Sequence, residues 1–258
     1  MGGTTVEFVR VDRRDGVVTI SLHRPERKNA ITPAMVEETI GVLTEVAGRV
    51  SDRAVVFTGS GDAFCSGMDL SARPEPDELT FMRRVTAMCT LLHELPQPTI
   101  ARVPGPAIGF GCNLAFCCDL VVAADTAVFG EIFAERGLAM DGGASWALPR
   151  LIGLAKAKEL LFFGARVPAD EALRLGMVNR VVPRAELDEF VEDWARRLAR
   201  GPRLALSLMK RALNTAMETS FAQAMEAEAV AQALSFRSPE AKEGMRAFAE
   251  RRPPNFTT

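Results

Sequence analysis

The sequence predicts an α/β domain followed by a tail of helices. Strand and helix patterns alternate as far as about residue 185, and several of the strands are apolar throughout, as expected for a sheet buried on both faces. Only helical patterns follow, and Gly201-Pro202 separates two of them. We therefore divide the 258 residues into a core, residues 1–200, and a C-terminal helical region, residues 201–258.

Local turn and capping signals predict the first elements. Residues 6–11 and 17–22 alternate apolar and polar side chains around Asp15-Gly16, a pattern typical of a β-hairpin. Thr32-Pro33 has the residue types preferred at a helix N-cap and at the first helical position. We expect the first helix to run from there to about residue 48.

The rest of the core continues the alternation of apolar strands with helices. Further strands are expected at residues 54–58, 98–103, 120–123 and 178–182. Further helices are expected at residues 77–94, from 111 onward, and at 155–163 and 168–175. In the tail, Ser238-Pro239-Glu240 begins the last helix, which ends before Pro253-Pro254.

The composition argues against several classes of function. The chain is 48% hydrophobic and 25% charged with a net charge of −2, values typical of a soluble globular protein. It has no basic stripe with interleaved aromatic residues, so nucleic-acid binding is not expected. No apolar run approaches the roughly 18 residues of a membrane span, and residues 1–16 lack the pattern of a secretory signal. Five cysteines, an odd number, fit reduced thiols in a cytoplasmic protein.

The cysteines do not have the spacing of a metal site. Cys112, Cys117 and Cys118 form no pair with the short spacing of a chelating turn, and the two histidines, His23 and His93, lie far away in sequence. Cysteine also serves as a small apolar residue in protein cores. We therefore expect these side chains to be buried packing residues, and we expect no bound metal.

Two glycine-flanked loops offer backbone N–H groups to a ligand. Gly109-Phe110-Gly111 lies between a strand and a helix, and Gly67-Met68 lies in a second glycine-rich loop. Two separate donors of this kind predict an oxyanion hole, which stabilises negative charge on a carbonyl oxygen. Tight turns that allow close packing of a helix are the alternative interpretation of these glycines.

A third loop carries a single carboxylate. Asp141 precedes Gly142-Gly143 and an amphipathic segment that begins near Trp146. The local sequence leaves two interpretations open, a turn or helix-cap residue and a functional carboxylate.

Taken together, these three loops resemble the enoyl-CoA hydratase/isomerase (crotonase) superfamily. The resemblance rests on AFCSGMDL (Ala63–Leu70), GPAIGFGCNLAFCCDLVVAADTAVFG (Gly105–Gly130) and GLAMDGGASWALPRLIG (Gly137–Gly153), and it extends over essentially the whole chain. It implies a spiral core of repeated β-β-α units followed by a helical trimerisation region. It also implies an acyl-CoA substrate, of which coenzyme A is a part, with no separate cofactor, and a homotrimer or a dimer of trimers.

The resemblance also assigns roles to particular residues. The oxyanion-hole N–H groups correspond to Met68 and Phe110. The coenzyme A-binding residues correspond to Arg27, Lys28, Ala30, Ala63, Ser66, Asp69 and Leu70. Phe110, Asn113 and Phe133 correspond to the acyl pocket. Phe110 departs from the family pattern, because glycine is the more usual residue there.

The carboxylates also depart from the hydratase pattern. The hydratases resembled here use two glutamates, and their positions correspond to Asn113 and Phe133. Asp141 stands where isomerase members carry a catalytic aspartate, and one carboxylate suffices to remove a proton and return it elsewhere. We therefore expect an isomerase that shifts a carbon–carbon double bond in an enoyl-CoA. The alternatives are a 2-enoyl-CoA hydratase that uses Asp141 or Glu135 to hold water, and an acyl-CoA-binding protein that has lost efficient catalysis.

Overall fold

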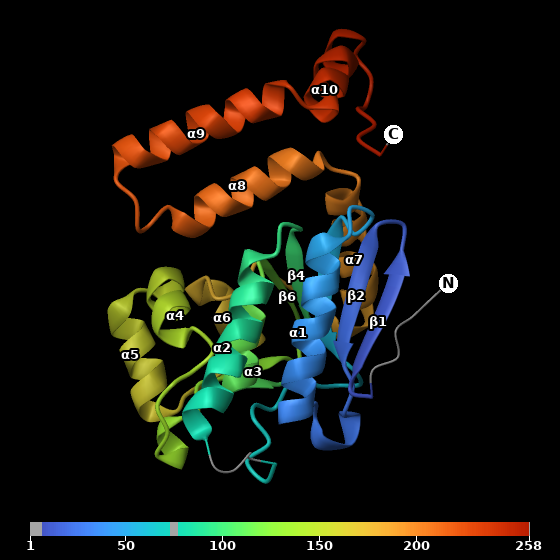
Figure 1. Ribbon diagram of the computed structural model, residues 1–258. Helices are drawn as coiled ribbons and strands as arrows, with labels where there is room; N and C mark the ends of the chain where they lie inside the picture. Colours follow the sequence, from blue (N-terminus) through green and yellow to red (C-terminus); the bar gives the residue numbers. More distant parts are fainter. Residues whose placement is uncertain (1–6, 73–76, 258) are drawn as a thin grey trace.

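The computed structural model describes residues 7–72 and 77–257 and confirms the predicted α/β class (Figure 1). Strands form a large six-stranded sheet and a small three-stranded sheet. In spatial order, the large sheet contains β1 (Val9–Arg14), β2 (Val17–Leu22), β3 (Ala54–Gly59), β4 (Thr99–Val103), β6 (Leu120–Ala124) and β9 (Arg180–Val182). The small sheet contains β5 (Ala107–Ile108), β7 (Val128–Gly130) and β8 (Arg166–Pro168).

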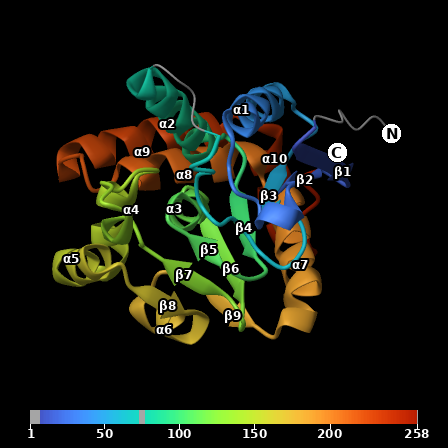
Figure 2. The ribbon, with the colours of Figure 1, turned by 90° about the horizontal axis from the view of Figure 1, so that it is seen from below.

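Helices surround the sheets and then continue as the tail (Figures 1 and 2). Those of the core are α1 (Pro33–Gly48), α2 (Glu78–Glu94), α3 (Phe110–Phe116), α4 (Ala144–Ile152), α5 (Leu154–Phe163), α6 (Ala169–Leu175) and α7 (Leu187–Ala199). Those of the tail are α8 (Arg203–Thr215), α9 (Phe221–Phe236) and α10 (Pro239–Ala249). A short 3₁₀ turn, Ala134–Arg136, lies between β7 and α4.

The predicted hairpin and caps are present. Strand β1 pairs antiparallel with β2, and Asp15 and Gly16 form the two-residue turn with φ of 52° and 81°, the left-handed conformation that such a turn requires. The Thr32 side chain accepts a hydrogen bond from the Met35 N–H at 3.2 Å, and that of Ser238 accepts one from the Ala241 N–H at 3.0 Å. Each of these features is fixed by residues close together in sequence.

Both faces of the large sheet are covered. All six residues of β3 are buried, which explains why this strand is apolar throughout rather than alternating. One face contributes to the main hydrophobic core together with α1, α2 and α3. Helix α7 covers the other face through Leu187, Val191 and Ala195, which pack on Val56 and Ile100 among others.

Three strands differ from the prediction, because β5, β7 and β8 were not expected. Each is only two or three residues long, too short to show an alternating pattern, and their pairing joins segments distant in sequence. Val6, predicted to begin the first strand, lies outside the described residues. The last strand of the large sheet begins at Arg180 rather than at the predicted residue 178, because Asn179 uses its side-chain oxygen to accept from the Val121 N–H at 2.7 Å.

The cysteines are packing residues, as predicted. Cys65, Cys89, Cys112, Cys117 and Cys118 are all buried, with free thiols. Within residues 7–72 and 77–257, no three His, Cys, Asp or Glu side chains gather closely enough to hold a metal ion. In the same part of the chain, no helix combines the length and the apolar character needed to cross a membrane.

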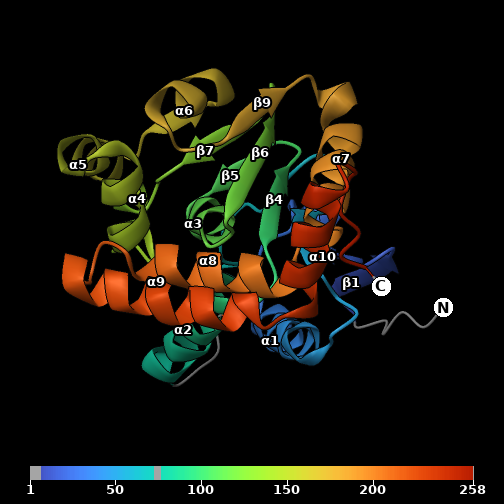
Figure 3. The same ribbon diagram turned by 90° about the horizontal axis from the view of Figure 1, so that it is seen from above.

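The tail lies across one end of the core (Figures 1 and 3). Arg53 fixes the junction, since its guanidinium donates to the carbonyl oxygens of Ala199, Gly201 and Phe256 at 2.5, 2.8 and 3.1 Å. Helices α8 and α9 bury no residue completely. They expose many large apolar side chains, including Met209, Leu213, Phe221, Met225, Val230, Leu234 and Phe236.

Candidate active site

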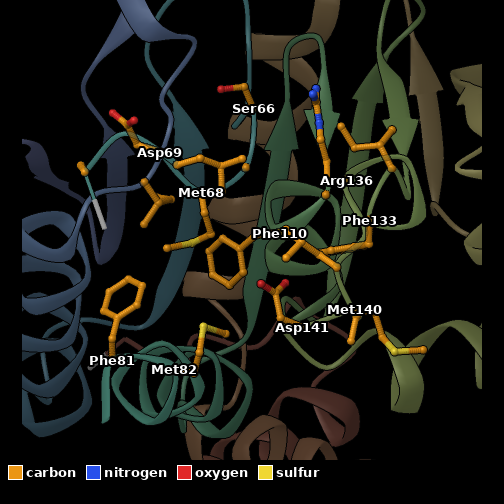
Figure 4. A pocket seen from close by; sticks show the side chains of 18 of the residues that line it. Ser66, Met68, Asp69, Phe81, Met82, Phe110, Phe133, Arg136, Met140 and Asp141 are labelled. Carbon is orange, nitrogen blue, oxygen red and sulfur yellow. The ribbon is translucent and has the colours of Figure 1, made fainter. Parts of the chain in front are cut away.

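The glycine-rich loops and Asp141 border one cavity of about 580 Å³ (Figure 4). Five segments line it: residues 31–33 at the start of α1, the loop after β3, the start of α2, the start of α3, and residues 132–141. Most of its lining is apolar, and Ser66, Asp69, Glu78, Arg136 and Asp141 contribute its charged and hydroxyl side chains. The cavity thus joins parts of the chain that lie up to 110 residues apart, from Ile31 to Asp141.

Two unpaired backbone N–H groups face this cavity from adjoining loops. Gly67 has φ of 101°, and a Cβ atom built on it would lie 3.1 Å from the Ile108 carbonyl oxygen and 3.9 Å from the Phe110 nitrogen. Met68 follows Gly67, and Phe110 is the first residue of α3. In the described part of the chain, neither the Met68 nor the Phe110 N–H donates a hydrogen bond to the protein. Both N–H groups are therefore free to donate a hydrogen bond to a ligand.

The Met68 loop is held by two polar side chains from the turn before α1. Asn29 is completely buried, and its side-chain amide donates to the carbonyl oxygens of Ser60, Ala63 and Phe64 at 3.0, 2.9 and 3.3 Å. Arg24 donates to the Asp69 carboxylate at 3.0 Å and to the Ala30 carbonyl oxygen at 2.7 Å.

Sequence reasoning did not identify either of these residues. Asn29 adopts the left-handed backbone conformation, with φ of 57°. Asparagine tolerates this conformation better than most residues, so its presence in a polar turn was the sequence signal that could have identified it.

The residues predicted to bind coenzyme A gather at one side of the cavity. Ser66, Asp69 and Leu70 line it directly. Arg27 and Lys28 are exposed beside Ser66, whose hydroxyl donates to the Arg27 carbonyl oxygen at 3.1 Å and whose N–H donates to that of Lys28 at 2.9 Å.

Ala30 and Ala63 do not line the cavity, and their carbonyl oxygens accept from Arg24 and Asn29. These two residues therefore help to hold the Met68 loop in position through their backbone hydrogen bonds.

Of the three residues predicted for the acyl pocket, two line the cavity. Phe110 and Phe133 do so, whereas Asn113 is 1% exposed and lies behind the lining. A Cβ atom on Gly142 would lie 2.9 Å from the Asn113 Cβ and 3.2 Å from the Phe110 ring, so the loop after Asp141 covers Asn113. Phe81, Met82 and Ile132, which sequence reasoning did not identify, also form the apolar wall, together with Leu138 and Met140, the apolar neighbours of Asp141 in sequence.

Asp141 is a partly buried carboxylate in the cavity wall, beside Phe110 (Figure 4). Its Oδ1 atom is buried without a hydrogen-bond partner in the described protein. Burial raises the pKa of Asp141 to about 6, because desolvation disfavours the charged form. Asp69 has the opposite environment, since hydrogen bonds from Ser71 and then Arg24 lower its pKa. The Asp141 carboxyl group can therefore exchange a proton near neutral pH.

The two glutamates near Phe133 have opposite environments. Glu135 is exposed and forms a two-point ion pair with Arg166, with N–O distances of 2.8 and 3.0 Å, and this pair lowers the pKa of Glu135. Glu131 is 1% exposed, and burial raises its pKa to about 7. Of these two glutamates, only Glu131 is buried and affected by the charge of Asp141, although it does not line the cavity.

Comparison with known proteins gives a family for this arrangement. Residues 12–258 match the enoyl-CoA hydratase/isomerase family. The chain is 35% identical to the 1,2-epoxyphenylacetyl-CoA isomerase of Escherichia coli, over 98% of this chain and 99% of that protein. It is also 35% identical to the crotonyl-CoA hydratase of Syntrophomonas wolfei, over 97% of this chain and 98% of that protein.

The solved structures agree with this family in fold. The crystal structure of an enoyl-CoA hydratase from Mycobacterium smegmatis superimposes with a TM-score of 0.92 at 36% identity, covering 98% of this chain and all of that one. The predicted crotonase fold with its C-terminal helices is therefore confirmed. Named relatives include both hydratases and an isomerase. The chain is an acyl-CoA-processing enzyme and belongs to the enoyl-CoA hydratase/isomerase family.

Proposed function

We propose that the protein is an isomerase that shifts a carbon–carbon double bond in an enoyl-CoA, with Asp141 as the acid–base residue. The observation that carries this proposal is the position of Asp141 in the same cavity wall as the two unpaired N–H groups of Met68 and Phe110. A relative named as a 1,2-epoxyphenylacetyl-CoA isomerase, 35% identical to this chain, supports the choice.

The reaction follows from the chemistry of a thioester. Asp141, as a carboxylate, removes a proton from a carbon of the acyl chain, and the electron pair moves onto the thioester carbonyl oxygen to give an enolate. The Met68 and Phe110 N–H groups donate hydrogen bonds to this oxygen as its charge develops. The protonated Asp141 then returns the proton to a different carbon, and the double bond is left in its new position. No water, redox partner or separate cofactor takes part.

The rest of the cavity would hold the substrate on either side of the thioester. Arg27 and Lys28, which are exposed beside Ser66, would meet phosphate groups of coenzyme A, and Ser66 and Leu70 would contact its thioester arm. Contacts to this remote part help to place the acyl carbon against Asp141. The aromatic walls formed by Phe110 and Phe133, backed by Asn113, would enclose an apolar acyl group.

Hydration of a 2-enoyl-CoA is the second candidate, because relatives of this chain include hydratases and because Glu131 offers a second buried carboxyl group whose pKa is raised. Glu135 does not favour it, since its carboxylate is engaged by Arg166.

One experiment separates the three functions. The purified protein is offered 3-enoyl-CoA, 2-enoyl-CoA and saturated acyl-CoA separately, with conjugation followed by ultraviolet absorbance and products by mass. Isomerisation conjugates 3-enoyl-CoA without a change in mass. Hydration adds the mass of water to 2-enoyl-CoA and would contradict the isomerase proposal. A protein that only binds acyl-CoA changes neither, and would contradict both enzymatic proposals.

We further propose that the tail assembles the protein into a homotrimer or a dimer of trimers. The apolar side chains that α8 and α9 expose are more numerous than a solvent-facing helix pair needs. We expect no nucleic-acid or membrane partner, and a cytoplasmic location.

A further inference from the structure

Three polar side chains with unpaired buried atoms gather here: Asp141 in the cavity wall, and Asn113 and Glu131 behind it. Asn113 comes from α3, Glu131 follows β7 directly, and Asp141 precedes α4. Six buried side-chain nitrogen or oxygen atoms in the described part of the chain lack a hydrogen-bond partner, and five of them belong to these three residues. Native proteins leave few such atoms, because each costs desolvation energy without a compensating bond. Their concentration at one place indicates a function.

The three side chains are close neighbours. Asn113 packs against the backbone of Gly142, which follows Asp141. Asn113 and the Cys112 thiol both lie near enough to Glu131 to lower the pKa of its carboxyl group, although no hydrogen bond of ordinary length reaches either oxygen. The charge of Asp141 also acts on Glu131. The backbone also joins Asn113 to the Glu131 segment: the Asn113 N–H donates to the Gly109 carbonyl oxygen at 3.3 Å, and the Gly109 N–H donates to that of Gly130 at 2.6 Å.

We propose that Glu131, Asn113 and Asp141 form one buried acid–base cluster, in which Glu131 keeps a proton behind the acyl pocket and Asn113 connects it to Asp141. Glu131 does not line the cavity. It is therefore a positioning residue, and it acts on the reaction through Asp141. The existence of this proton does not depend on the reaction catalysed, whereas its effect on turnover rests on the proposed function.

The surroundings of the cluster favour this order of ionisation. Burial is the main cause that raises the pKa of both carboxyl groups, to about 6 for Asp141 and about 7 for Glu131. Since Asp141 ionises first, it loses its proton beside a neutral acid, whereas Glu131 must lose its own beside an existing negative charge. The negative charge of an ionised Asp141 accordingly contributes to the raised pKa of Glu131, after burial as the main cause.

In the described part of the chain no salt bridge reaches either carboxyl group, and Arg136 lines the same cavity as Asp141 without pairing with it. The thiols of Cys112, Cys65 and Cys89 are the other titratable groups that interact with the cluster, and burial raises the pKa of Cys112 and Cys65, which keeps them neutral. For Cys89, the neighbouring Cys117 thiol is the larger cause and burial the second. Arg166 approaches Gly130, but its guanidinium is bound to Glu135. The proton on Glu131 thus replaces a missing counter-ion.

The donors and acceptors of the cluster match when Glu131 is protonated. Its single O–H can donate to the Asn113 side-chain oxygen, which leaves the Asn113 amide N–H groups to donate to the Asp141 carboxylate. An ionised Glu131 is an acceptor only, and it draws the amide N–H groups away from Asp141. Turnover should therefore require an ionised Asp141 together with a protonated Glu131, and should fall when Glu131 ionises.

The first test detects the proton directly in the full-length protein. Infrared difference spectroscopy at about pH 6.5 should show the C=O band of a buried protonated carboxyl group. Glu131→Gln should abolish the Glu131 part of this band, whereas the matched variant Glu135→Gln, at an exposed ion-paired site, should retain it. A band that survives unchanged in Glu131→Gln, or no protonated carboxyl band in the parent, would overturn the proposal, whatever reaction the enzyme catalyses.

The second test measures kcat/KM for 3-enoyl-CoA from pH 5.5 to 9. The parent should lose activity above about pH 7, by about tenfold per pH unit once Glu131 titrates. In Glu131→Gln, whose amide is a permanent donor, this fall should vanish, while the fall at low pH that reports Asp141 should remain. An unchanged fall at high pH in the variant would contradict the role of Glu131. If the parent converts no 3-enoyl-CoA, the proposed function fails and the infrared test alone decides the cluster.

Discussion

The core and the tail of this molecule use apolar residues in different ways. In the core, apolar side chains of β3, α1 and α3 are buried against one another, and they fix the loops that carry Met68, Phe110 and Asp141. In the tail, α8 and α9 are as rich in Leu, Met and Phe, yet neither buries a residue completely. The core therefore contains the chemistry within a single chain. The tail exposes apolar side chains of the kind that the proposed oligomer would bury.

The largest effect should come from removing the tail. Deleting residues 201–258 takes away α8, α9 and α10 together with two of the three carbonyl groups that Arg53 binds. We expect the shortened protein to aggregate or to lose its oligomeric state, as judged by size-exclusion chromatography with light scattering. If the full-length protein itself behaves as a stable monomer, the tail is not an assembly region.

A backbone donor in the core should be nearly as sensitive. Phe110→Pro removes the proposed donor N–H, and proline is tolerated at the first position of a helix, which Phe110 occupies in α3. Turnover should fall by roughly 10²–10³-fold, the usual cost of one oxyanion-hole donor.

The control is Phe110→Gly, which removes the ring but keeps the N–H, and it should retain appreciable activity. Equal losses in the two variants would indicate that the ring, rather than the amide, is what matters at this position.

The close backbone contact between the loop after β3 and the start of α3 should affect the free energy of unfolding. A Cβ atom on Gly111 would lie 2.3 Å from the Cys65 carbonyl oxygen, so Gly111→Ala must push the loops apart. We expect it to lower the free energy of unfolding by about 1–3 kcal/mol, the usual cost of overpacking. Gly48→Ala at the end of α1, where the new Cβ meets nothing within 4 Å, should be neutral or stabilising. Urea denaturation of both variants checks this contrast, and equal stabilities would contradict it.

A smaller effect is expected on the free energy of unfolding, because an ionised Asp141 is destabilised by its partial burial in the cavity wall. Its pKa is raised from 3.8 to about 6, so folding favours the protonated form and the fold loses stability as pH rises from about 4 to about 6. Asp141→Asn removes this cost. The variant should be more stable than the parent at pH 7, by about 1–3 kcal/mol, and should show no gain below pH 4. Thermal denaturation at both pH values tests the sign, and an equal gain at both would contradict it.

Local features of the fold and of the site could be predicted from the sequence, because they depend on residues near one another. The Asp15-Gly16 hairpin and the Thr32 cap are of this kind, and so is the glycine before Met68. Strands β5, β7 and β8 escaped prediction because two or three residues cannot show a period.

The rest of the site depends on tertiary contacts. Phe81 lines the cavity only because the start of α2 lies beside the glycine-rich loops in the fold. Asn29 donates hydrogen bonds to carbonyl oxygens of residues 31 to 35 positions later in the sequence. The spacing of Glu131 and Glu135 could not show which one is buried. The structure shows that Glu131 is buried, whereas Arg166 holds Glu135 at the surface.

The most direct test of the whole account is the conversion of 3-enoyl-CoA to 2-enoyl-CoA by Asp141→Asn. Asparagine keeps the size and hydrogen-bonding capacity of the side chain but cannot accept the proton. The account predicts a folded variant that binds acyl-CoA about as well as the parent, measured by calorimetry, and loses at least roughly 10²-fold in isomerase turnover. Undiminished turnover in a folded variant would contradict the assignment of Asp141 as the acid–base residue.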